Sequence, residues 1–191
     1  MGTVSEARSG QSTVLVVMGV SGVGKTTIAR SLAARLGWDF ADGDEFHPQA
    51  NIDKMASGHP LTDEDRWPWL RAIATWITDH GASGQGGVVA CSALKRAYRD
   101  ILRGPGVVFV YLAGDRATIA RRIGARHGHF MPSSLLDSQL AALEPPDPDE
   151  SAITVDVGAG PSQIVDQVVR QLRSVPGSAS ATVSRNRVTP G

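Results

Sequence analysis

The chain has 191 residues, in which 19 lysines and arginines balance 19 aspartates and glutamates. This length fits one α/β domain with a sizeable core, and the even charge excludes a global field that would gather nucleic acid or an anionic membrane. No apolar run is long enough to span a bilayer. The single cysteine, Cys91, excludes a disulfide within the chain and favours a reducing compartment, so we expect a cytoplasmic protein.

Both ends of the chain lack the apolar residues that a packed core needs. Residues 1–12 have no apolar stretch of the kind found in secretion signals, so we expect them to form a disordered leader. Residues 176–191 are rich in Ser, Thr, Gly and Pro and are expected to form a disordered tail. The folded domain is therefore predicted to cover residues 13–175.

A strand, a glycine-rich loop and a helix are predicted in succession near the N-terminus. The apolar, β-branched run Thr13–Met18 indicates a buried parallel strand. Apolar residues four apart predict a helix over residues 27–36, which ends at Gly37. Between these elements, residues 19–26 read GVSGVGKT and match the pattern G-x-x-x-x-G-K-[ST] at every fixed position. The pattern predicts a P-loop.

The P-loop has the chemistry of a nucleoside triphosphate site. Its glycines let several backbone N–H groups converge on one anion, and the start of the following helix adds the positive end of its dipole. Lys25 can reach the outer phosphates, and the Thr26 hydroxyl can ligate Mg²⁺. The predicted nucleotide-binding residues of this segment are Gly19, Val20, Ser21, Gly22, Val23, Gly24, Lys25, Thr26 and Thr27.

Two carboxylates follow the next predicted strand, residues 38–41. Asp42 and Asp44 are two residues apart, so in an extended segment their side chains point to the same face. The carboxyl end of a parallel strand is also where ligands bind in this architecture. An Asp-Gly turn with solvated acids is the alternative, but the nearby P-loop favours a functional pair.

The segment Thr62–Asp65 predicts a capping box that opens a long helix, with Gly81 as its stop. Pro68 is tolerable only in the first turn of a helix, which favours a start as late as Asp65. The aromatic residues of this helix are interpreted as core or domain-seam packing residues rather than ligand contacts. They are Trp67, Trp69 and Trp76.

Strands and helices alternate through the rest of the chain. Residues 88–91, 107–112 and 153–157 predict three further buried strands. Helices are predicted through Tyr98, over 115–126, over 133–143 and from Ile164 to Leu172. This alternation is typical of a parallel sheet with right-handed crossovers. We therefore expect a P-loop NTPase three-layer sandwich, with five parallel strands and helices on both faces.

A P-loop alone does not separate kinases from GTPases, motor ATPases or regulators. No Asn-Lys-x-Asp motif supports guanine selectivity, and the arginine-rich helix over 115–126 breaks near Gly128. Small metabolite kinases carry a lid at this point of the chain, so we expect a lid over about 122–143. Arg122 and Arg126 are its candidates for contact with the triphosphate. A solvated basic face is the alternative for this helix.

More restrictive motifs follow the P-loop in a fixed order: DGDEFHP at 42–48, PLTDEDRWPWL at 60–70, CSALK at 91–95 and GHFM at 128–131. Taken together, the sequence resembles the short, P-loop-type gluconokinases, which are related to shikimate and adenylate kinases. The resemblance runs from about Val14 to Val169. It implies a kinase that transfers the γ-phosphoryl group of ATP to the terminal hydroxyl of D-gluconate, with Mg²⁺ and ATP bound at the P-loop.

Phosphoryl transfer depends mostly on positioning and charge stabilisation. The predicted catalytic residues are Lys25, Asp44 and Arg126, of which Asp44 orients the acceptor hydroxyl and receives its proton late. Thr26 and Asp42 are the predicted metal residues, with Asp42 acting through metal-bound water. The opposite assignment, in which Asp42 accepts the proton and Asp44 serves the metal, stays open.

A sugar acid needs a cation for its carboxylate and polar groups for its hydroxyls. Arg66 is the first candidate for the carboxylate because a guanidinium offers a paired fork of donors. The other predicted substrate-binding residues are Asp44, His47, Lys54, Ser92, Lys95 and His129. Structural alternatives remain for three of them, as a turn cap (His47), a solvated helix residue (Lys54) or the start of a surface helix (Lys95).

Two other functions remain to be separated from this one. A shikimate or nucleotide monophosphate kinase would share the scaffold but has no reason to carry the motif at 42–48. A non-catalytic ATP-binding switch module would not need Lys25, Thr26 and the paired acids together. The resemblance also implies a homodimer, and no nucleic-acid or membrane partner is expected.

Overall fold

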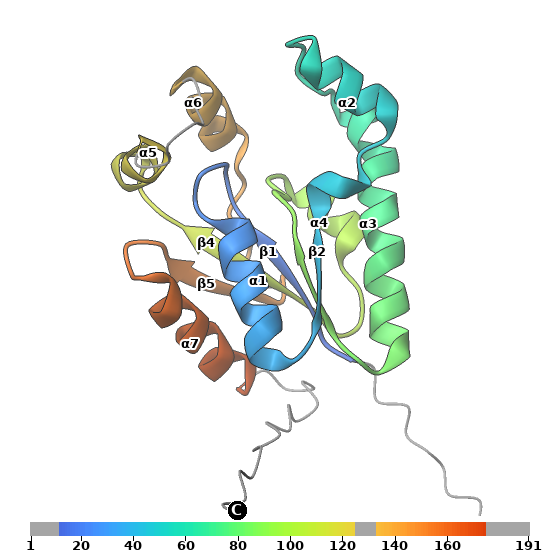
Figure 1. Ribbon diagram of the computed structural model, residues 1–191, viewed down its shortest axis with the longest axis vertical. Helices are drawn as coiled ribbons and strands as arrows, with labels where there is room; N and C mark the ends of the chain where they lie inside the picture. The colour runs from blue at the N-terminus through green and yellow to red at the C-terminus, as the bar shows by residue number, and fades with distance from the viewer. Residues whose placement is uncertain (1–11, 125–132, 175–191) are drawn as a thin grey trace, which may run out of the picture.

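A five-stranded parallel sheet organises the computed structural model, which describes residues 12–124 and 133–174 (Figure 1). The strands are β1 (Val14–Met18), β2 (Asp39–Asp42), β3 (Gly87–Ala90), β4 (Val107–Ala113) and β5 (Ala152–Asp156). Their order is β2-β3-β1-β4-β5, and every neighbouring pair is parallel. The predicted five-stranded parallel sheet is confirmed.

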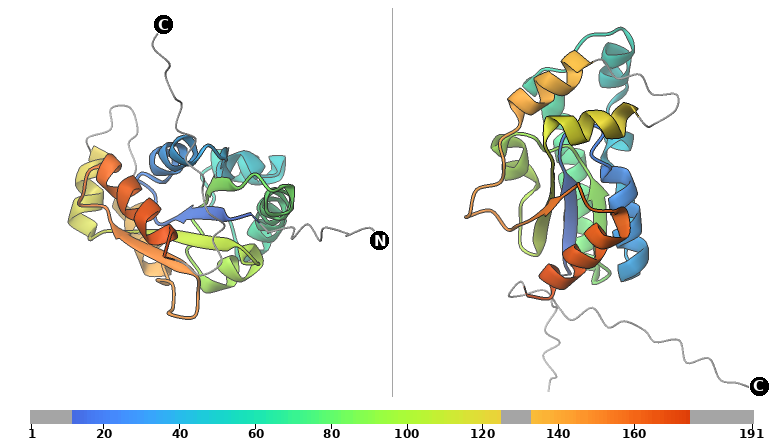
Figure 2. Two further views of the ribbon diagram at one scale, coloured as in Figure 1. Left: turned by 90° about the horizontal axis from the view of Figure 1, so that it is seen from below. Right: turned by 90° about the vertical axis from the view of Figure 1, so that its left-hand side faces the viewer.

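Helices connect the strands and cover both faces of the sheet (Figure 2). They are α1 (Lys25–Leu36), the 3₁₀ turn η1 (Gly43–Phe46), α2 (Gln49–Ala56), α3 (Asp63–Ser83), α4 (Arg96–Leu102), α5 (Arg116–Gly124), α6 (Ser133–Ala142) and α7 (Pro161–Leu172). None of the helices in the described ranges has the length and apolar character that a bilayer span requires.

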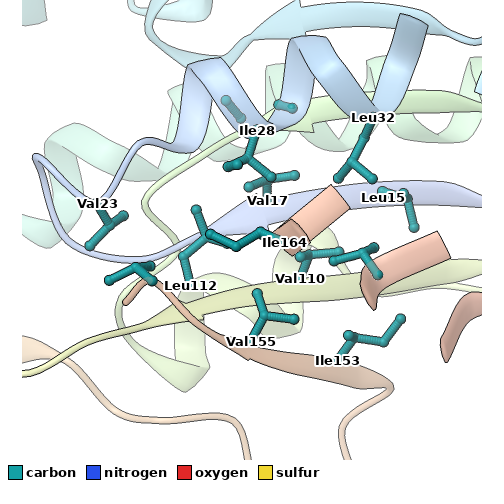
Figure 3. Close-up of a cluster of buried hydrophobic side chains, with 14 of the residues drawn as sticks. Leu15, Val17, Val23, Ile28, Leu32, Val110, Leu112, Ile153, Val155 and Ile164 are labelled. Atoms are coloured by element: carbon teal, nitrogen blue, oxygen red, sulfur yellow. The ribbon is translucent and has the colours of Figure 1, made fainter. Parts of the chain in front are cut away.

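The central strand β1 separates two cores because alternate residues of a strand point to opposite faces. Leu15 and Val17 belong to the core that α1 and α7 cover, which Figure 3 shows in close-up. Val14, Val16 and Met18 belong to the core beneath α3 and α4. Burial on both faces explains why the strands read as continuous apolar runs.

The strand order reverses at β1, which lies between β3 and β4. Val17 of β1 is level with Ala90 of β3 and Val110 of β4, so these strands end at a common edge. The P-loop (residues 19–26) leaves β1 at this edge, and Figure 1 shows α2, α5 and α6 at the same end of the molecule. Ligands of open α/β sheets bind at such a switch point.

Helix α3 begins with the predicted capping box but earlier than expected. Thr62 Oγ1 accepts a hydrogen bond from the Asp65 N–H at 3.3 Å, and the Asp65 carboxylate accepts one from the Thr62 N–H at 2.7 Å. The helix starts at Asp63, so the expectation of a start near Asp65 is wrong and Pro68 lies inside the helix. Pro68 and Glu64, whose carbonyl loses its helical donor, are both exposed, so water can replace that donor.

The expectation that Gly81 stops α3 is also wrong. The helix continues to Ser83 and is capped by Gly84, whose φ of 83° is left-handed. Gly81 is buried, and its carbonyl accepts a hydrogen bond from the Ser12 N–H at 3.0 Å. This bond docks the last turns of α3 beside the start of β1. It also places Ser12, which the sequence assigned to the leader, in the folded part.

The tryptophans of α3 are packing residues, as expected. Trp69 is buried in the α3–α4 core, and Trp67 and Trp76 are half-buried against it. The rest of the predicted leader and the whole predicted tail lie outside the described residues. The predicted lid is described over residues 122–124 and 133–143, so Arg126 and His129 lie outside the described residues too.

Candidate active site

The P-loop has a backbone that only glycine adopts readily at three of its positions. Gly19, Gly22 and Gly24 have φ values of 141°, 86° and 101°. A Cβ at Gly22 would also lie 2.3 Å from the Ile123 side chain. Lys25 Nζ donates a hydrogen bond to the Val20 carbonyl at 3.0 Å, so the ammonium lies along the loop that is predicted to hold phosphates.

The structure brings the two predicted metal residues together. Thr26 Oγ1 donates a hydrogen bond to Asp42 Oδ2 at 3.1 Å, across the width of β3 in the sheet. The other oxygen of Asp42 accepts a hydrogen bond from the Asp44 N–H at 3.2 Å. A hydroxyl beside a carboxylate suits Mg²⁺, which takes oxygen ligands and is usually held by few protein groups. Asp44 itself is exposed in η1.

Gly43 fixes the position of this acidic turn because its backbone lies directly on β3. A Cβ at Gly43 would lie 2.4 Å from the Ala90 carbonyl oxygen, which no side chain tolerates. On the other side, Trp69 Nε1 donates a hydrogen bond to the Gly43 carbonyl at 2.6 Å. The turn that carries Asp42 and Asp44 is therefore held between β3 and α3.

We expect Gly43→Ala to lower the free energy of unfolding by about 1–3 kcal/mol, because the new methyl group must push the turn away from β3. The same shift should lower kinase activity, since both acids move with the turn. Thermal unfolding and steady-state kinetics measure the two effects. Gly124→Ala is the matched control, because Gly124 lies in a helix and a Cβ there meets no atom within 4 Å. Equal stability of the two variants would contradict the close contact.

His47 lies behind the acidic turn against α3. Its ring stacks on Trp69 with centroids 4.4 Å apart, and its Nδ1 is 3.4 Å from Asn51 Nδ2. Burial lowers the pKa of His47 below its usual value; the charge of Asp44 opposes this lowering and that of Arg66 adds to it. The imidazole is therefore neutral near pH 7, and it lies within electrostatic reach of Asp44 and Arg66.

Asp63 contacts two of the cations predicted to bind the substrate, Arg66 and Lys95. We call this part of the site, where the phosphoryl acceptor is expected, the acceptor side. Lys95 Nζ donates to the two oxygens of Asp63 at 3.0 and 2.8 Å, and the Tyr98 hydroxyl donates to Oδ1 at 2.5 Å. Arg66 Nη1 lies 3.6 Å from the same carboxylate and donates to the Leu61 carbonyl at 2.6 Å. The hydrogen bonds from Lys95 and Tyr98 lower the pKa of Asp63. Arg66 and Lys95, both predicted for substrate, thus share one partner.

In this structure Lys54 pairs with an acid of α3. Its ammonium donates to Asp65 Oδ2 at 2.6 Å, and the same oxygen belongs to the capping box of α3. The hydrogen bond from Lys54, followed by that from the Thr62 N–H, lowers the pKa of Asp65 to about 2. Lys54 therefore links α2 to the start of α3, and its contact with substrate stays a prediction.

We expect Lys54→Met to raise the pKa of Asp65 from about 2 toward the usual value of 3.8, with part of the lowering kept by the Thr62 N–H. Because the folded-state pKa lies below the unfolded one, this pair stabilises the protein above pH 4 and loses its effect as the pH falls toward 2. An NMR titration of the Asp65 carboxyl carbon measures the shift. Arg71→Met, on the exposed side of α3, is the control, and an unchanged Asp65 titration in K54M would contradict the assignment.

The two described parts of the predicted lid contact the P-loop. Gln139 of α6 accepts a hydrogen bond from the Ser21 N–H at 2.7 Å and donates one to Ser21 Oγ at 3.0 Å. Arg122 of α5 donates to the carbonyls of Val23 (3.3 Å), Val157 and Ala159 (3.0 Å). The guanidinium of Arg122 therefore lies against the backbone of the P-loop, and its contact with nucleotide stays a prediction.

Ser92 and Lys95 lie in the loop between β3 and α4. The Ser92 carbonyl accepts a hydrogen bond from the N–H of Gly19, the first residue of the P-loop, at 3.2 Å. Lys95 reaches Asp63 on the acceptor side. This loop thus contacts the predicted nucleotide site at one end and carries a predicted substrate residue at the other.

Sequence reasoning missed Asp63, Tyr98 and Gln139 as parts of the site. Asp63 lies within the capping-box segment, where an acid is expected for helix stability alone. Tyr98 and Gln139 lie in short helices, and their spacing gave no signal beyond packing. The proximity of Asp63 to Lys95, which lies 32 residues away in the sequence, depends on how α3 and α4 pack.

The chain is similar in sequence and in structure to known small-molecule kinases. The sequence model of the shikimate kinase family, described as "Shikimate kinase", matches residues 21–173. The gluconokinase of Gluconobacter oxydans (strain 621H) is 49% identical over 162 residues, which cover 84% of this chain and 91% of that relative.

Two solved structures share both sequence and fold. A sugar kinase from Janibacter sp. HTCC2649 is 48% identical with a TM-score of 0.79, and the match covers 88% of this chain and 99% of that one. A gluconokinase from Sinorhizobium meliloti 1021 is 46% identical with a TM-score of 0.77, covering 87% of this chain and 94% of that one. The matches extend over both the P-loop side and the acceptor side of the candidate site.

Proposed function

This chain belongs to the shikimate kinase family and, within it, to the gluconokinases, and on that basis we propose that it phosphorylates D-gluconate with ATP, giving 6-phospho-D-gluconate and ADP. One observation carries the proposal. A P-loop with Lys25 and Thr26, the acids Asp42 and Asp44, and a cationic acceptor side lie at one edge of the sheet in a chain 49% identical to a gluconokinase.

The P-loop supplies the donor side of the reaction. In the proposed complex, backbone N–H groups at the start of α1 hold the phosphates, and Lys25 turns from the Val20 carbonyl to the outer phosphates. Thr26 and Asp42 are the residues that would hold Mg²⁺, Asp42 through a water molecule. The ion, when bound, neutralises charge on the phosphate oxygens. Arg122, beside the Val23 carbonyl, and Arg126 would add positive charge over the transferred group.

The acceptor side holds and orients the sugar acid. Asp44 is exposed and next to Asp42, so it can accept a hydrogen bond from the terminal hydroxyl and receive the proton as the new P–O bond forms. Arg66 and Lys95 both lie beside Asp63 and provide the cations that the substrate carboxylate needs. His47, Lys54, Ser92 and His129 complete the proposed set of residues for the hydroxyl groups.

A coupled assay of ADP release with gluconate, shikimate and AMP as acceptors tests the proposed function. We expect turnover with gluconate at a typical kinase rate of about 1–100 s⁻¹, with phosphate attached at the terminal hydroxyl by ³¹P NMR. Turnover with shikimate or AMP but not gluconate would identify another small-molecule kinase. Nucleotide binding without turnover of any acceptor would favour the switch module instead.

We also propose a cytoplasmic homodimer. The resemblance to gluconokinases supports the dimer, and light scattering of the purified protein tests it, since a monomer at micromolar concentration would contradict it. The single cysteine, which is free and buried in this structure, supports a reducing compartment.

A further inference from the structure

A buried ion pair lies beneath the loop between β3 and α4. The side chains of Arg99 and Glu150 are only 1% and 2% exposed, and they form two parallel hydrogen bonds: Arg99 Nε to Glu150 Oε2 at 2.6 Å, and Nη2 to Oε1 at 2.8 Å. Glu150 also accepts a hydrogen bond from the Asp147 N–H at 2.9 Å. None of the proposed catalytic steps uses this pair. A buried pair of this kind is weak evidence for stability, because its desolvation offsets its attraction.

The third guanidinium nitrogen of Arg99, Nη1, donates hydrogen bonds to backbone carbonyls rather than to side chains. It donates to the carbonyls of Ala93 and Leu94, each at 3.2 Å, and of Glu144 at 2.9 Å. Ala93 has a φ of 43°, and within the described residues it is the one non-glycine residue with a positive φ. Such a conformation is strained for a residue with a Cβ and persists only where the surroundings hold it.

The loop that Arg99 holds connects the two halves of the site. Near its start, the Ser92 carbonyl accepts a hydrogen bond from the P-loop N–H of Gly19. Its last residue, Lys95, donates to Asp63 on the acceptor side. A second contact reinforces the middle of the loop, because the Glu144 N–H donates to the Leu94 carbonyl at 2.8 Å. A shift of the loop would therefore move Lys95 relative to the P-loop.

We propose that Arg99 and Glu150 are positioning residues that set the distance between the phosphoryl donor and the acceptor by fixing residues 92–95. Glu150 holds the guanidinium in place, and the guanidinium holds the strained Ala93 carbonyl and its neighbour. An apolar pair could fill the same volume but could not donate hydrogen bonds to these carbonyls. The kinetic part of this inference rests on the proposed gluconokinase function, whereas the structural part does not.

The double variant R99M/E150M tests the proposal. It removes both charges together, because Arg99→Met alone would leave Glu150 buried without its partner. We expect a folded protein with a Tm near that of the wild type, but a loss of about 100-fold in kcat/KM for gluconate, the scale expected when reacting groups are misplaced by about 1 Å. The KM for ATP should change by less than about twofold, since the P-loop keeps its own contacts. Hydrogen exchange should accelerate in a peptide covering residues 91–98.

Arg103→Ala is the matched control, because Arg103 lies just past the end of α4 and its side chain forms an exposed ion pair with Asp100. It should leave kinetics and exchange unchanged. Wild-type gluconate kinetics and exchange in R99M/E150M would overturn the proposal, as would an equal rise in the KM values for ATP and for gluconate. If the double variant does not fold, Arg99→Lys decides by the same readouts, since it keeps the charge but not the fork of donors. Absent turnover in the wild type would refute the proposed function, and the exchange result would still decide the positioning role.

Discussion

Replacing Asp44 with asparagine is expected to lower kcat for gluconate phosphorylation by about 10²–10⁴-fold, the range typical for loss of a group that accepts a proton during reaction. The carboxamide has nearly the same shape, but it cannot receive the proton of the acceptor hydroxyl. The KM for ATP should stay near the wild-type value because the hydrogen bond that links Asp44 to Asp42 comes from its backbone N–H, which the substitution keeps. Steady-state kinetics with each substrate varied in turn measures both effects.

Glu45→Gln is the control for this variant, since Glu45 is the next residue of η1 and is likewise exposed. It should retain wild-type kinetics. Unchanged kcat in D44N would show that Asp44 is not the acceptor base. Asp42→Asn would then be the next variant, because the roles of the two acids would be exchanged. If Asp42 serves the metal instead, D42N should mainly raise the Mg²⁺ concentration needed for half-maximal activity.

Replacing Lys25 with methionine is expected to lower kcat/KM for ATP by at least about 10²–10³-fold. A loss of this size follows when an enzyme loses one hydrogen-bond donor to the charge that develops in the transition state. Methionine keeps much of the length and volume but cannot neutralise the phosphate oxygens. Its thioether also cannot donate to the Val20 carbonyl as Lys25 does. Stopped-flow or steady-state assays with ATP, together with calorimetric binding of a non-hydrolysable ATP analogue, separate loss of affinity from loss of rate.

Arg30→Met provides the comparison in the same helix. Arg30 is exposed, and its guanidinium lies 4.9 Å from the Phe40 ring centroid, away from the loop. The variant removes one positive charge from α1, so it controls for the general electrostatic effect of K25M. Full activity in K25M would refute the assignment of residues 19–26 as a phosphate site. A similar loss in both variants would show that charge on the helix, rather than Lys25 itself, matters.

The sheet and the P-loop were predictable because their signals are local. Short strand patterns predicted all five strands to within one or two residues, although the second strand has no β-branched residue. The spacing of two glycines, a lysine and a threonine predicted the phosphate loop. The place of the paired acids at the end of β2 was also predictable, since they follow a strand that ends at the ligand-binding edge. The extended segment expected between them was not, because Gly43–Phe46 form a 3₁₀ turn. Each of these features depends on residues that are neighbours in the sequence.

The rest of the site depends on contacts between distant segments. Nothing near Asp63 in the sequence indicates that Lys95 and Tyr98 donate to it, and nothing near Arg99 indicates that Glu150, 51 residues later, balances its charge. Arginine is rarely fully buried, and nothing in the residues around Arg99 indicates that it lies in the interior. The two errors at the ends of α3 have different causes. At its start, the local capping box of Thr62 and Asp65 outweighed the preference of Pro68 for the first turn. At its end, Gly81 is buried against Ser12 and the helix continues to Ser83.

Asp42 presents one oxygen to Thr26 of the donor half and the other to the N–H of Asp44 in the acceptor half. Any rotation of this carboxylate toward metal-bound water changes its hold on Asp44 as well. The affinities for MgATP and for gluconate are therefore expected to be thermodynamically linked. Linkage is reciprocal, so the factor by which gluconate changes the dissociation constant of nucleotide must equal the factor by which nucleotide changes that of gluconate.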